Sequence, residues 1–394
     1  MADGNSNLHL NRRDFLRLAT ALGGAAALTS FLEACSKAGI DPETLLSPTN
    51  TVVMPSPTHI SATEPAVTPV PEKVQSTETQ ATSTETPTGV PNDGLARVAF
   101  VKTSDRAEGV RIALDLLGMN PVAGKRIFLK PNFNSADPPP GSTHPDMLIA
   151  LVKALQDMGA EQITVGDRSG MGDTRRVMQQ IGVFELAETL GFDIIVFDEL
   201  GPENWAMIQL PGAHWREGFP FARPCLEAEA LVQTCCLKTH RYGGHFTMSL
   251  KNSVGMVAKR DLQDGHDYMQ ELHASPHQRR MIAEINTAYE PALIVLDGLE
   301  AFISGGPDKG ERVSPQVILA GTDRIAIDAA GVALLRFFGC QTEAGQGKIF
   351  QQEQIARAVD LGLGVDGPEK IEFLTGDKDS EAYSEEIKGI LLAG

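Results

Sequence analysis

From residue 95 onward, short apolar runs alternate with segments in which apolar residues recur at helical spacing. A strand, a helix and a second strand in succession typically form a parallel pair with the helix packed on the sheet. The alternation therefore predicts an α/β fold with a mainly parallel sheet and helices on both faces. The predicted strands are 96–101, 126–129, 162–165, 193–197, 228–237, 292–296 and 316–319. The predicted helices are 106–117, 146–158, 174–181, 183–190, 278–288, 323–338 and 351–361. The segment 205–224 is predicted to be irregular or a hairpin, and a last strand and helix follow.

The acidic balance of the chain restricts its partners. Its 394 residues carry a formal net charge of −17, whereas a protein that binds nucleic acid normally presents a basic face. We therefore expect no nucleic-acid partner. The five cysteines include no run of four that would hold an intrinsic iron–sulfur cluster. Cys235 and Cys236, adjacent in a predicted strand, are expected to be buried on opposite faces.

The first residues have the features of an export signal. The sequence NRRDFLR at 11–17 resembles a twin-arginine signal. The apolar segment 18–32 that follows is shorter than the roughly 20 residues of a membrane span. Next comes LEAC, which is similar to a lipobox and predicts lipidation of Cys35. Because Glu33 is unusual in a lipobox, plain cleavage and an uncleaved anchor stay as alternatives.

Composition divides the chain into three regions. Residues 47–93 are rich in Thr, Pro, Ser and Glu and hold 8 of the 24 prolines. Such a segment buries too little apolar surface to offset its ordering entropy, which predicts disorder. We therefore expect a signal peptide at 1–34, a disordered linker at 35–94 and an α/β domain at 95–394. The expected location is outside the cytoplasm, with the twin-arginine export machinery as a partner and the membrane reached through Cys35.

Polar side chains follow five of the predicted strands, at the point where each strand ends. In a parallel sheet the carboxyl ends lie along one edge, where ligands bind in α/β proteins. We therefore expect these side chains to converge on a shared site. They are Lys130 and Asn132 after the second strand, Asp167 after the third, Lys238 and His240 after the fifth, Asp297 after the sixth and Asp323 after the seventh.

The stretch that begins at the fifth strand end holds two lysines and two histidines around a pair of glycines. In one interpretation, Lys238 and Lys251 neutralise an anionic ligand while a histidine, His240 or His245, exchanges protons near neutral pH. In another, His240 and His245 bind a divalent metal ion with Asp167 or Asp297, because histidine and carboxylate ligands suit zinc, manganese or non-haem iron. A third alternative is a surface loop on a glycine turn.

Three other positions have both a functional and a structural interpretation. Lys130 and Asn132 flank a proline, so they bind an anion or merely end a strand. His144 precedes a predicted helix, whose N-terminus has free amide donors that suit phosphate or carboxylate. In the alternative interpretation, His144 only caps that helix. Asp323 is predicted to be an N-cap rather than a ligand.

Several short motifs occur in a fixed order along the chain. They are Lys130-Pro131-Asn132, Thr143-His144-Pro145, Lys238-Thr239-His240, Ser249-Leu250-Lys251-Asn252, Asp297-Gly298, Gly305-Gly306-Pro307 and Gly321-Thr322-Asp323 through Asp328. In this order they resemble the family called domain of unknown function 362, over about residues 96–339. The resemblance implies a Rossmann-like α/β core but no established reaction. Some relatives carry ferredoxin-type clusters in an added segment, but this chain has no run of four cysteines that would hold one.

The leading functional hypothesis is an exported enzyme that acts on a small anionic substrate, with a divalent metal ion or a redox partner as further expectations. The alternative is a non-catalytic lipoprotein that binds a solute or a partner. A third hypothesis is a redox component that docks a partner carrying a cluster. The predicted catalytic residues are His144, Lys238, His240 and Lys251, the predicted ligand-binding residues are Lys130, Asn132, Asn252 and Asp297, and the predicted metal ligands are His240, His245 and Asp167.

Overall fold

The structure, a computed structural model, describes residues 94–261 and 263–394. The predicted signal peptide, the lipidation site Cys35 and the linker up to residue 93 lie outside the described residues. Within the described ranges, no helix has both the length and the apolar character needed to cross a membrane. Export and membrane anchoring therefore stay predictions.

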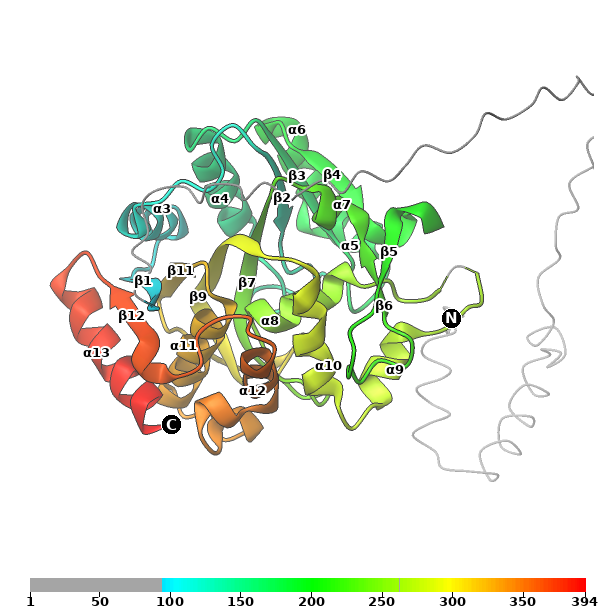
Figure 1. Ribbon diagram of the computed structural model, residues 1–394. Helices are drawn as coiled ribbons and strands as arrows, with labels where there is room; N and C mark the ends of the chain where they lie inside the picture. Colours follow the sequence, from blue (N-terminus) through cyan, green and yellow to red (C-terminus); the bar gives the residue numbers. More distant parts are fainter. Residues whose placement is uncertain (1–93, 262) are drawn as a thin grey trace, which may run out of the picture. The chain divides into compact units, whose positions relative to one another are not determined.

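A ten-stranded sheet forms the centre of the described chain (Figure 1). Its main order is β12 (Ile371–Leu374), β1 (Ala96–Lys102), β11 (Val317–Gly321), β9 (Pro291–Gly305), β7 (Ala230–His240), β2 (Arg126–Lys130), β3 (Gln162–Asp167) and β4 (Asp193–Val196), with β10 (Gly310–Val313) on β9 and β8 (His245–Thr247) on β7. Parallel pairs join β12 to β1 and run from β9 through β7, β2 and β3 to β4. Antiparallel pairs join β11 to β1 and β9, β10 to β9, and β8 to β7.

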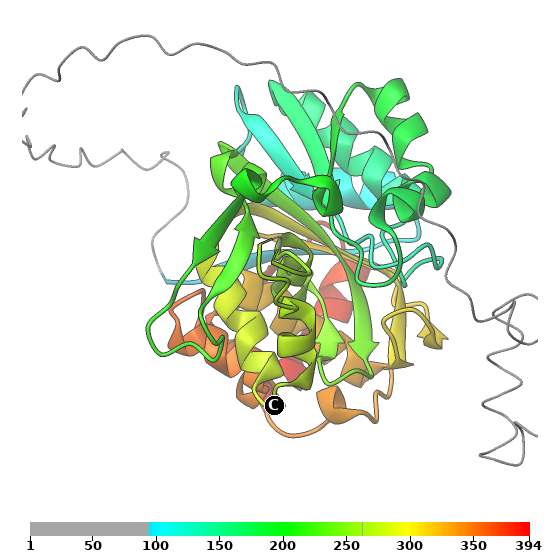
Figure 2. The same cartoon turned by 90° about the vertical axis from the view of Figure 1, so that its right-hand side faces the viewer.

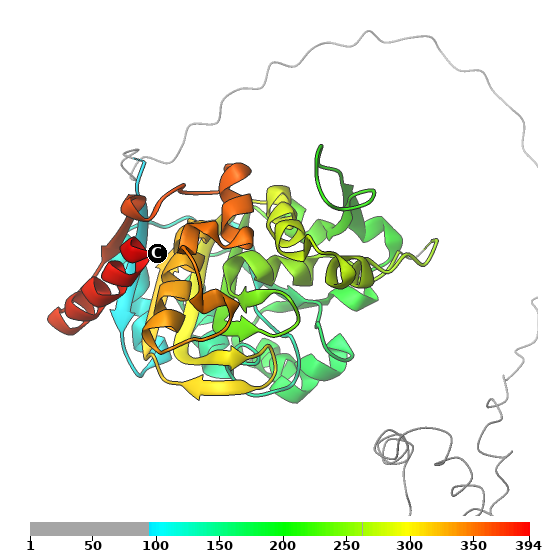
Figure 3. The same cartoon turned by 90° about the horizontal axis from the view of Figure 1, so that it is seen from below.

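Helices cover both faces of the sheet because its strand residues alternate between two apolar clusters. Val98 and Phe100 belong to one cluster, and Ala99 and Val101 belong to the other. Figure 3 shows β12 and α13 beside β1 at one edge. The predicted α/β fold with a mainly parallel sheet is confirmed. One face is covered by α3 (Arg106–Leu117), α4 (Pro145–Asp157), α5 (Thr174–Ile181) and α6 (Val183–Leu190), and the other by α8 (Ser249–Asn252), α11 (Arg324–Phe337), α12 (Glu353–Asp360) and α13 (Lys378–Ala393).

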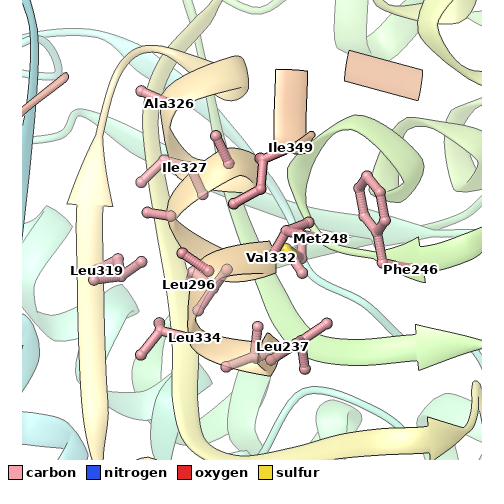
Figure 4. Packing of buried hydrophobic residues seen from close by; sticks show 14 of the residues in the cluster. Leu237, Phe246, Met248, Leu296, Leu319, Ala326, Ile327, Val332, Leu334 and Ile349 are labelled. Carbon is pink, nitrogen blue, oxygen red and sulfur yellow. The ribbon is translucent and has the colours of Figure 1, made fainter. Parts of the chain in front are cut away.

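Helix α11 packs across the centre of its face. Figure 4 shows Leu334 of α11 close to Leu237 of β7 and Leu296 of β9, all of which are inaccessible to solvent. The helix begins after Asp323, whose carboxylate accepts hydrogen bonds of 2.8 Å from two backbone amides of the first turn. This geometry confirms the predicted N-cap.

A third apolar cluster lies to one side of the sheet, where an antiparallel hairpin packs beside two helices (Figure 2). Phe219 and Phe221 of the hairpin join Tyr268 and Met281 in this cluster. The hairpin confirms one of the two interpretations of the irregular segment. The elements are β5 (Trp205–Ile208), β6 (Phe219–Ala222), α7 (Arg223–Glu227), α9 (Tyr268–Ala274) and α10 (Gln278–Ile285). Helix α9 was not predicted from the sequence.

The two adjacent cysteines occupy the middle of β7. Cys235 and Cys236 are 1% and 3% exposed, and both thiols are free. Burial raises the pKa of Cys236 to about 11. The prediction that these residues are buried is therefore confirmed.

The order of the strands reverses between β2 and β7. The chain adds β3 and then β4 on one side of β2 and afterwards places β7 on its other side. In open α/β sheets, ligands bind outside the carboxyl ends of the strands at such a reversal. The fold therefore favours a site where β2, β3 and β7 end.

Two of the five predicted strand ends do not reach this site. Strand β11 runs antiparallel to β9, so that Asp323 follows it at the opposite edge of the sheet. Strand β9 continues through Asp297 as far as Gly305, so that Asp297 lies within a strand and not at its end. The predicted convergence of five strand ends was therefore wrong for these two.

Candidate functional site

A cavity of about 310 Å³ lies at the carboxyl ends of β2, β3 and β7. Helices α8 and α9 supply further lining residues. Seven of the residues selected from the sequence line it, namely Lys130, Asn132, Asp167, Lys238, His240, Lys251 and Asn252. The sequence therefore predicted most of the polar wall of this cavity. The remaining lining residues are Asn134, Arg168, Gly170, Met171, Tyr242, Thr247, Val254, Gly255, Met269, His273 and Pro307.

Lys130 and Asp167 form a buried ion pair at the base of the cavity. The Nζ atom of Lys130 lies 2.7 Å from Oδ1 of Asp167 and donates a hydrogen bond of 3.1 Å to Oδ1 of Asn252. The second carboxylate oxygen of Asp167 accepts a bond of 2.7 Å from the backbone N–H of Phe133. Since each charge has its opposite and both groups are hydrogen-bonded, this pair adds little net charge to the cavity.

Lys238 is a buried cation whose partners are all neutral. Its Nζ atom donates to Oδ1 of Asn132 at 2.9 Å, to the carbonyl of Gly141 at 2.6 Å and to the carbonyl of Pro307 at 3.3 Å. No described carboxylate forms an ion pair with it. Burial lowers its pKa from the ordinary lysine value. Its hydrogen bonds are satisfied, but its positive charge is not neutralised.

Arg168 is a second such cation. Its guanidinium donates to the backbone carbonyls of Val257 at 2.7 Å and Val254 at 2.5 Å. The side chain is buried and forms no ion pair with a described carboxylate. Burial lowers its pKa, but an arginine keeps its charge in a protein. Arg168 and Lys238 thus make the cavity electropositive.

Lys251 differs from the other cations of the cavity. Its side chain is buried and lines the cavity, yet its Nζ atom has no hydrogen-bond or ion-pair partner among the described residues. Burial, followed by the charges of Lys238 and Arg168, lowers its pKa to about 7. A buried amine of this kind is available to a ligand.

Three further polar atoms in the wall are buried without a partner. They are Nδ2 of Asn134, Nδ1 of His240 and Oγ1 of Thr247. Buried polar atoms in proteins are nearly always hydrogen-bonded, so a group of orphans around one cavity points to a ligand. Burial, with the nearby charges of Lys251 and Lys238, holds the pKa of His240 well below its usual value. The imidazole is therefore neutral at pH 7.

Two glycines allow the polar groups to pack this closely. A Cβ atom at Gly255 would lie 2.4 Å from Oδ1 of Asp167 and 2.8 Å from Nζ of Lys130. A Cβ atom at Gly244 would lie 2.7 Å from Cε of Lys251 and 2.9 Å from Nδ1 of His240. All four distances are below 3.0 Å, so a side chain at either position would displace these groups. Lys251 and His240 therefore contact the same backbone segment, at Gly244.

Helix α8 carries Lys251 and is held in place by α11. The carboxylate of Asp328 accepts hydrogen bonds from the backbone N–H groups of Ser249 at 2.7 Å and Leu250 at 3.1 Å. Asn252 donates to the carbonyl of Thr234 at 3.2 Å. These bonds fix both ends of a single helical turn, which is too short to be stable alone.

The structure corrects the predicted grouping of His144 and Asp297 with the site. His144 is the N-cap of α4, where its Nδ1 atom accepts a hydrogen bond of 3.0 Å from the backbone N–H of Asp146. Asp297 pairs with Arg106, with 2.7 Å between Oδ2 and Nε. Neither His144 nor Asp297 lines the cavity. Each side chain is occupied by a structural partner.

The predicted metal site of His240, His245 and Asp167 does not form. His245 is opposite His240 in the pairing of β7 and β8, and its backbone is in the left-handed region with a φ of 59°. Its Nδ1 atom lies 3.4 Å from Oε1 of Gln352, and the residue does not line the cavity. No group of three or more His, Cys, Asp or Glu side chains in the described ranges is arranged to hold a metal ion. That assignment was therefore wrong.

Several cavity residues were not selected from the sequence. Asn134 lies two positions after Asn132, and Arg168 directly follows Asp167, so proximity to a selected residue was the available signal. Thr247 belongs to β8 and His273 to α9. Neither of these short elements was predicted, so their residues had no assigned place in the fold.

Known proteins resemble this chain over the same region. A family model described as domain of unknown function (DUF362) matches residues 127–333. The thylakoid-associated protein sll1697 of Synechocystis sp. is 26% identical over 210 residues, a match that covers 52% of this chain and 61% of that protein. The chain thus matches less than two thirds of that relative's length.

A solved structure, that of the lactate racemase apoprotein from Thermoanaerobacterium thermosaccharolyticum, matches with a TM-score of 0.37 and 15% identity, and covers 75% of this chain and 86% of that one. A TM-score this low supports no inference about function. The family model, in contrast, spans more than half of the chain and contains every residue that lines the cavity. The chain belongs to the family described as domain of unknown function DUF362.

Proposed function

We propose that the cavity binds a small anionic molecule and that the protein is an enzyme that acts on it. The observation that carries this proposal is Lys251, a largely buried residue of the cavity wall whose Nζ atom has no partner among the described residues. Lys238 and Arg168 add two buried charges that form no ion pair with a described carboxylate. Because a buried charge without a direct counter-charge is costly, the arrangement favours a ligand that supplies negative charge.

Catalysis is favoured over simple binding by the proton affinity of Lys251. Its pKa is about 7, whereas burial holds the pKa of His240 well below its usual value, so that Lys251 is the group that titrates near neutral pH. Groups that exchange protons near neutral pH are those that serve as general acids and bases. A receptor for an anion needs positive charge but no group that titrates at pH 7.

Calorimetric titration with small anions tests the proposal. The full chain is titrated with phosphate, bicarbonate and lactate, and at least one of them should bind. In Lys251→Met the dissociation constant should rise by about tenfold or more, because a hydrogen bond to a charged group contributes about 1.5–3 kcal/mol. Lys153→Met, at an exposed position on α4, is the matched control and should bind like the wild type. Binding that is unchanged in Lys251→Met would refute the assignment of the site.

We also propose that the protein is exported by the twin-arginine machinery and anchored to the membrane through Cys35. The support is the order of the twin-arginine sequence at 11–17, the apolar segment at 18–32 and the cysteine that follows. The substrate would then be an anion present outside the cytoplasm.

A further inference from the structure

We infer that the ligand of the cavity is a carboxylate that also carries a carbonyl group, such as a 2-oxo acid or an aldehyde acid, and that Lys251 forms an imine with it. The inference rests on the proposed binding of an anion and names its chemical class. The argument starts from the difference between Lys251 and the other cations of the cavity.

The other three cations of the cavity already have partners in the protein. The ammonium of Lys130 is bound by Asp167, that of Lys238 by three oxygens, and the guanidinium of Arg168 by backbone carbonyls. These groups supply positive potential from fixed positions. Lys251 has no such partner among the described residues, so its amine can move to and react with a ligand.

The surroundings of Lys251 also favour its neutral form. The groups that face it are Lys238 and His240 from β7, Arg168 after β3 and His273 from α9, and none of them is acidic. With a pKa of about 7, about half of the amine is unprotonated at pH 7, whereas an exposed lysine with a pKa of about 10.4 is almost fully protonated. Only the unprotonated amine attacks a carbonyl carbon, and a nearby cation is a known means of producing it.

The other orphan atoms are suited to the rest of such a ligand. The buried Nδ2 of Asn134 and the hydroxyl of Thr247 lack partners and can donate to a carboxylate. Nδ1 of His240 also lacks a partner and lies beside Gly244, which Lys251 contacts as well. His240 can therefore form a hydrogen bond with a ligand that is bound next to the amine. The volume of about 310 Å³ admits a small molecule.

The covalent step balances without an oxidant or a reductant. The lone pair of Lys251 Nζ forms a bond to the carbonyl carbon, and the electron pair of the C=O double bond moves to oxygen. One proton passes from that nitrogen to the oxygen, which gives a carbinolamine. A second proton, taken from solvent, then reaches the hydroxyl group, the C–O bond breaks, water leaves and the nitrogen lone pair forms the C=N bond. The carboxylate of the ligand offsets the charge of the protonated imine.

Reductive trapping tests the inference on the full chain. The protein is incubated with pyruvate or glyoxylate and cyanoborohydride, which delivers hydride to the imine carbon and leaves a stable secondary amine. Peptide mapping by mass spectrometry should locate the adduct at Lys251. The rate should be half-maximal near pH 7, in line with the pKa of about 7, whereas exposed Lys153 should react mainly above about pH 9. Acetone lacks a carboxylate, so it should label Lys251 at no more than about one tenth of the rate seen with pyruvate.

The outcomes separate this inference from the proposed function. If phosphate or lactate binds in the titration but Lys251 is labelled no faster than Lys153, the imine is refuted and the anion site stands. If no anion binds and Lys251 is not labelled, both are refuted. Labelling that is lost in Lys251→Met but kept in Lys153→Met supports the imine. The pH profile of the wild type decides the matter even if a variant folds poorly.

Discussion

The ammonium group of Lys251 belongs to a largely buried side chain and has no protein acceptor in the described chain. Its pKa falls to about 7, whereas in the unfolded chain it is about 10.4. Between these values the unfolded state binds more protons than the folded state, so the free energy of unfolding rises with pH. A lysine with a lowered pKa therefore destabilises the fold most below pH 7.

We predict that Lys251→Met removes this pH dependence. At pH 6 the variant should be more stable than the wild type, by an amount on the order of a few kcal/mol. The difference should shrink as pH is raised from about 7 to about 10. Urea unfolding of both proteins across this range measures the effect. If the free energies of unfolding of the two proteins change with pH in parallel, the pKa of Lys251 is not lowered in the folded state.

At the same scale, the sequence indicated which residues meet but not how each is bonded. Lys130, Lys238 and Lys251 were selected as equivalent anion-binding cations. In the structure, the first is paired with Asp167, the second is held by neutral oxygens and the third has no partner. Residue type and spacing fix the edge of the sheet on which a side chain lies. They do not fix its partners, because these come from loops far away in the chain.

At the scale of elements, local signals located the helices well. Helices α3 and α5 begin and end where predicted, since Asp105 and Asp173 cap their N-termini and Gly118 and Gly182 follow in the left-handed conformation. The direction of β11 was missed. Parallel strands require a crossover of a dozen or more residues that is usually helical. Between β9 and β11 the chain holds only β10, so β11 returns antiparallel.

The support of α8 by α11 leads to a second prediction. Asp328→Ala should lower the free energy of unfolding by about 2–3 kcal/mol, because two buried backbone N–H groups lose their acceptor. It should also weaken anion binding, since α8 carries Lys251. Burial raises the pKa of Asp328 to about 8, so the side chain is largely neutral at pH 7. Asp328→Asn keeps one of the two acceptor oxygens and should therefore lose less than Asp328→Ala. Equal losses in the two variants would contradict this role.

A third prediction concerns the turn after α8. Gly255→Ala should destabilise the fold by about 1–3 kcal/mol, because its Cβ would overlap the buried pair of Lys130 and Asp167. Gly389→Ala is the control, since no atom lies within 4 Å of a Cβ at that position. Because alanine favours a helix over glycine, this control in α13 should be neutral or more stable by up to about 1 kcal/mol. If the denaturation curves of the two variants coincide, Gly255 does not lie as close to Lys130 and Asp167 as described.

At the scale of the whole molecule, the formal charge of −17 contrasts with an electropositive cavity lined by four lysine and arginine side chains and one aspartate. Composition therefore leads to the expectation of no nucleic-acid partner, but it does not indicate a cavity with this charge. The resemblance to the family covered the cavity-lining residues, which are discontinuous in sequence and contiguous in space. The extent of the linker and the lipidation of Cys35 lie outside the described residues.

The proposed export leads to a fourth prediction. Replacing Arg12 and Arg13 together by lysine should keep the protein in the cytoplasm, because the twin-arginine pathway reads the arginine pair. Cys35→Ala should still be exported but should leave the membrane fraction, since one lipid anchor is lost. Cell fractionation followed by immunoblotting measures both. Membrane attachment that persists in Cys35→Ala would instead indicate an uncleaved anchor.

The single ammonium of Lys238 joins two loops of the chain to β7, because its acceptors belong to Asn132 and Gly141 on one loop and to Pro307 on another. If either loop opened alone, it would leave a buried charge with fewer hydrogen bonds. The two loops should consequently fluctuate as one unit, and their backbone amides should show matched protection in hydrogen exchange. A ligand that binds beside Lys238 should therefore slow hydrogen exchange in both loops together, although they are far apart in the sequence.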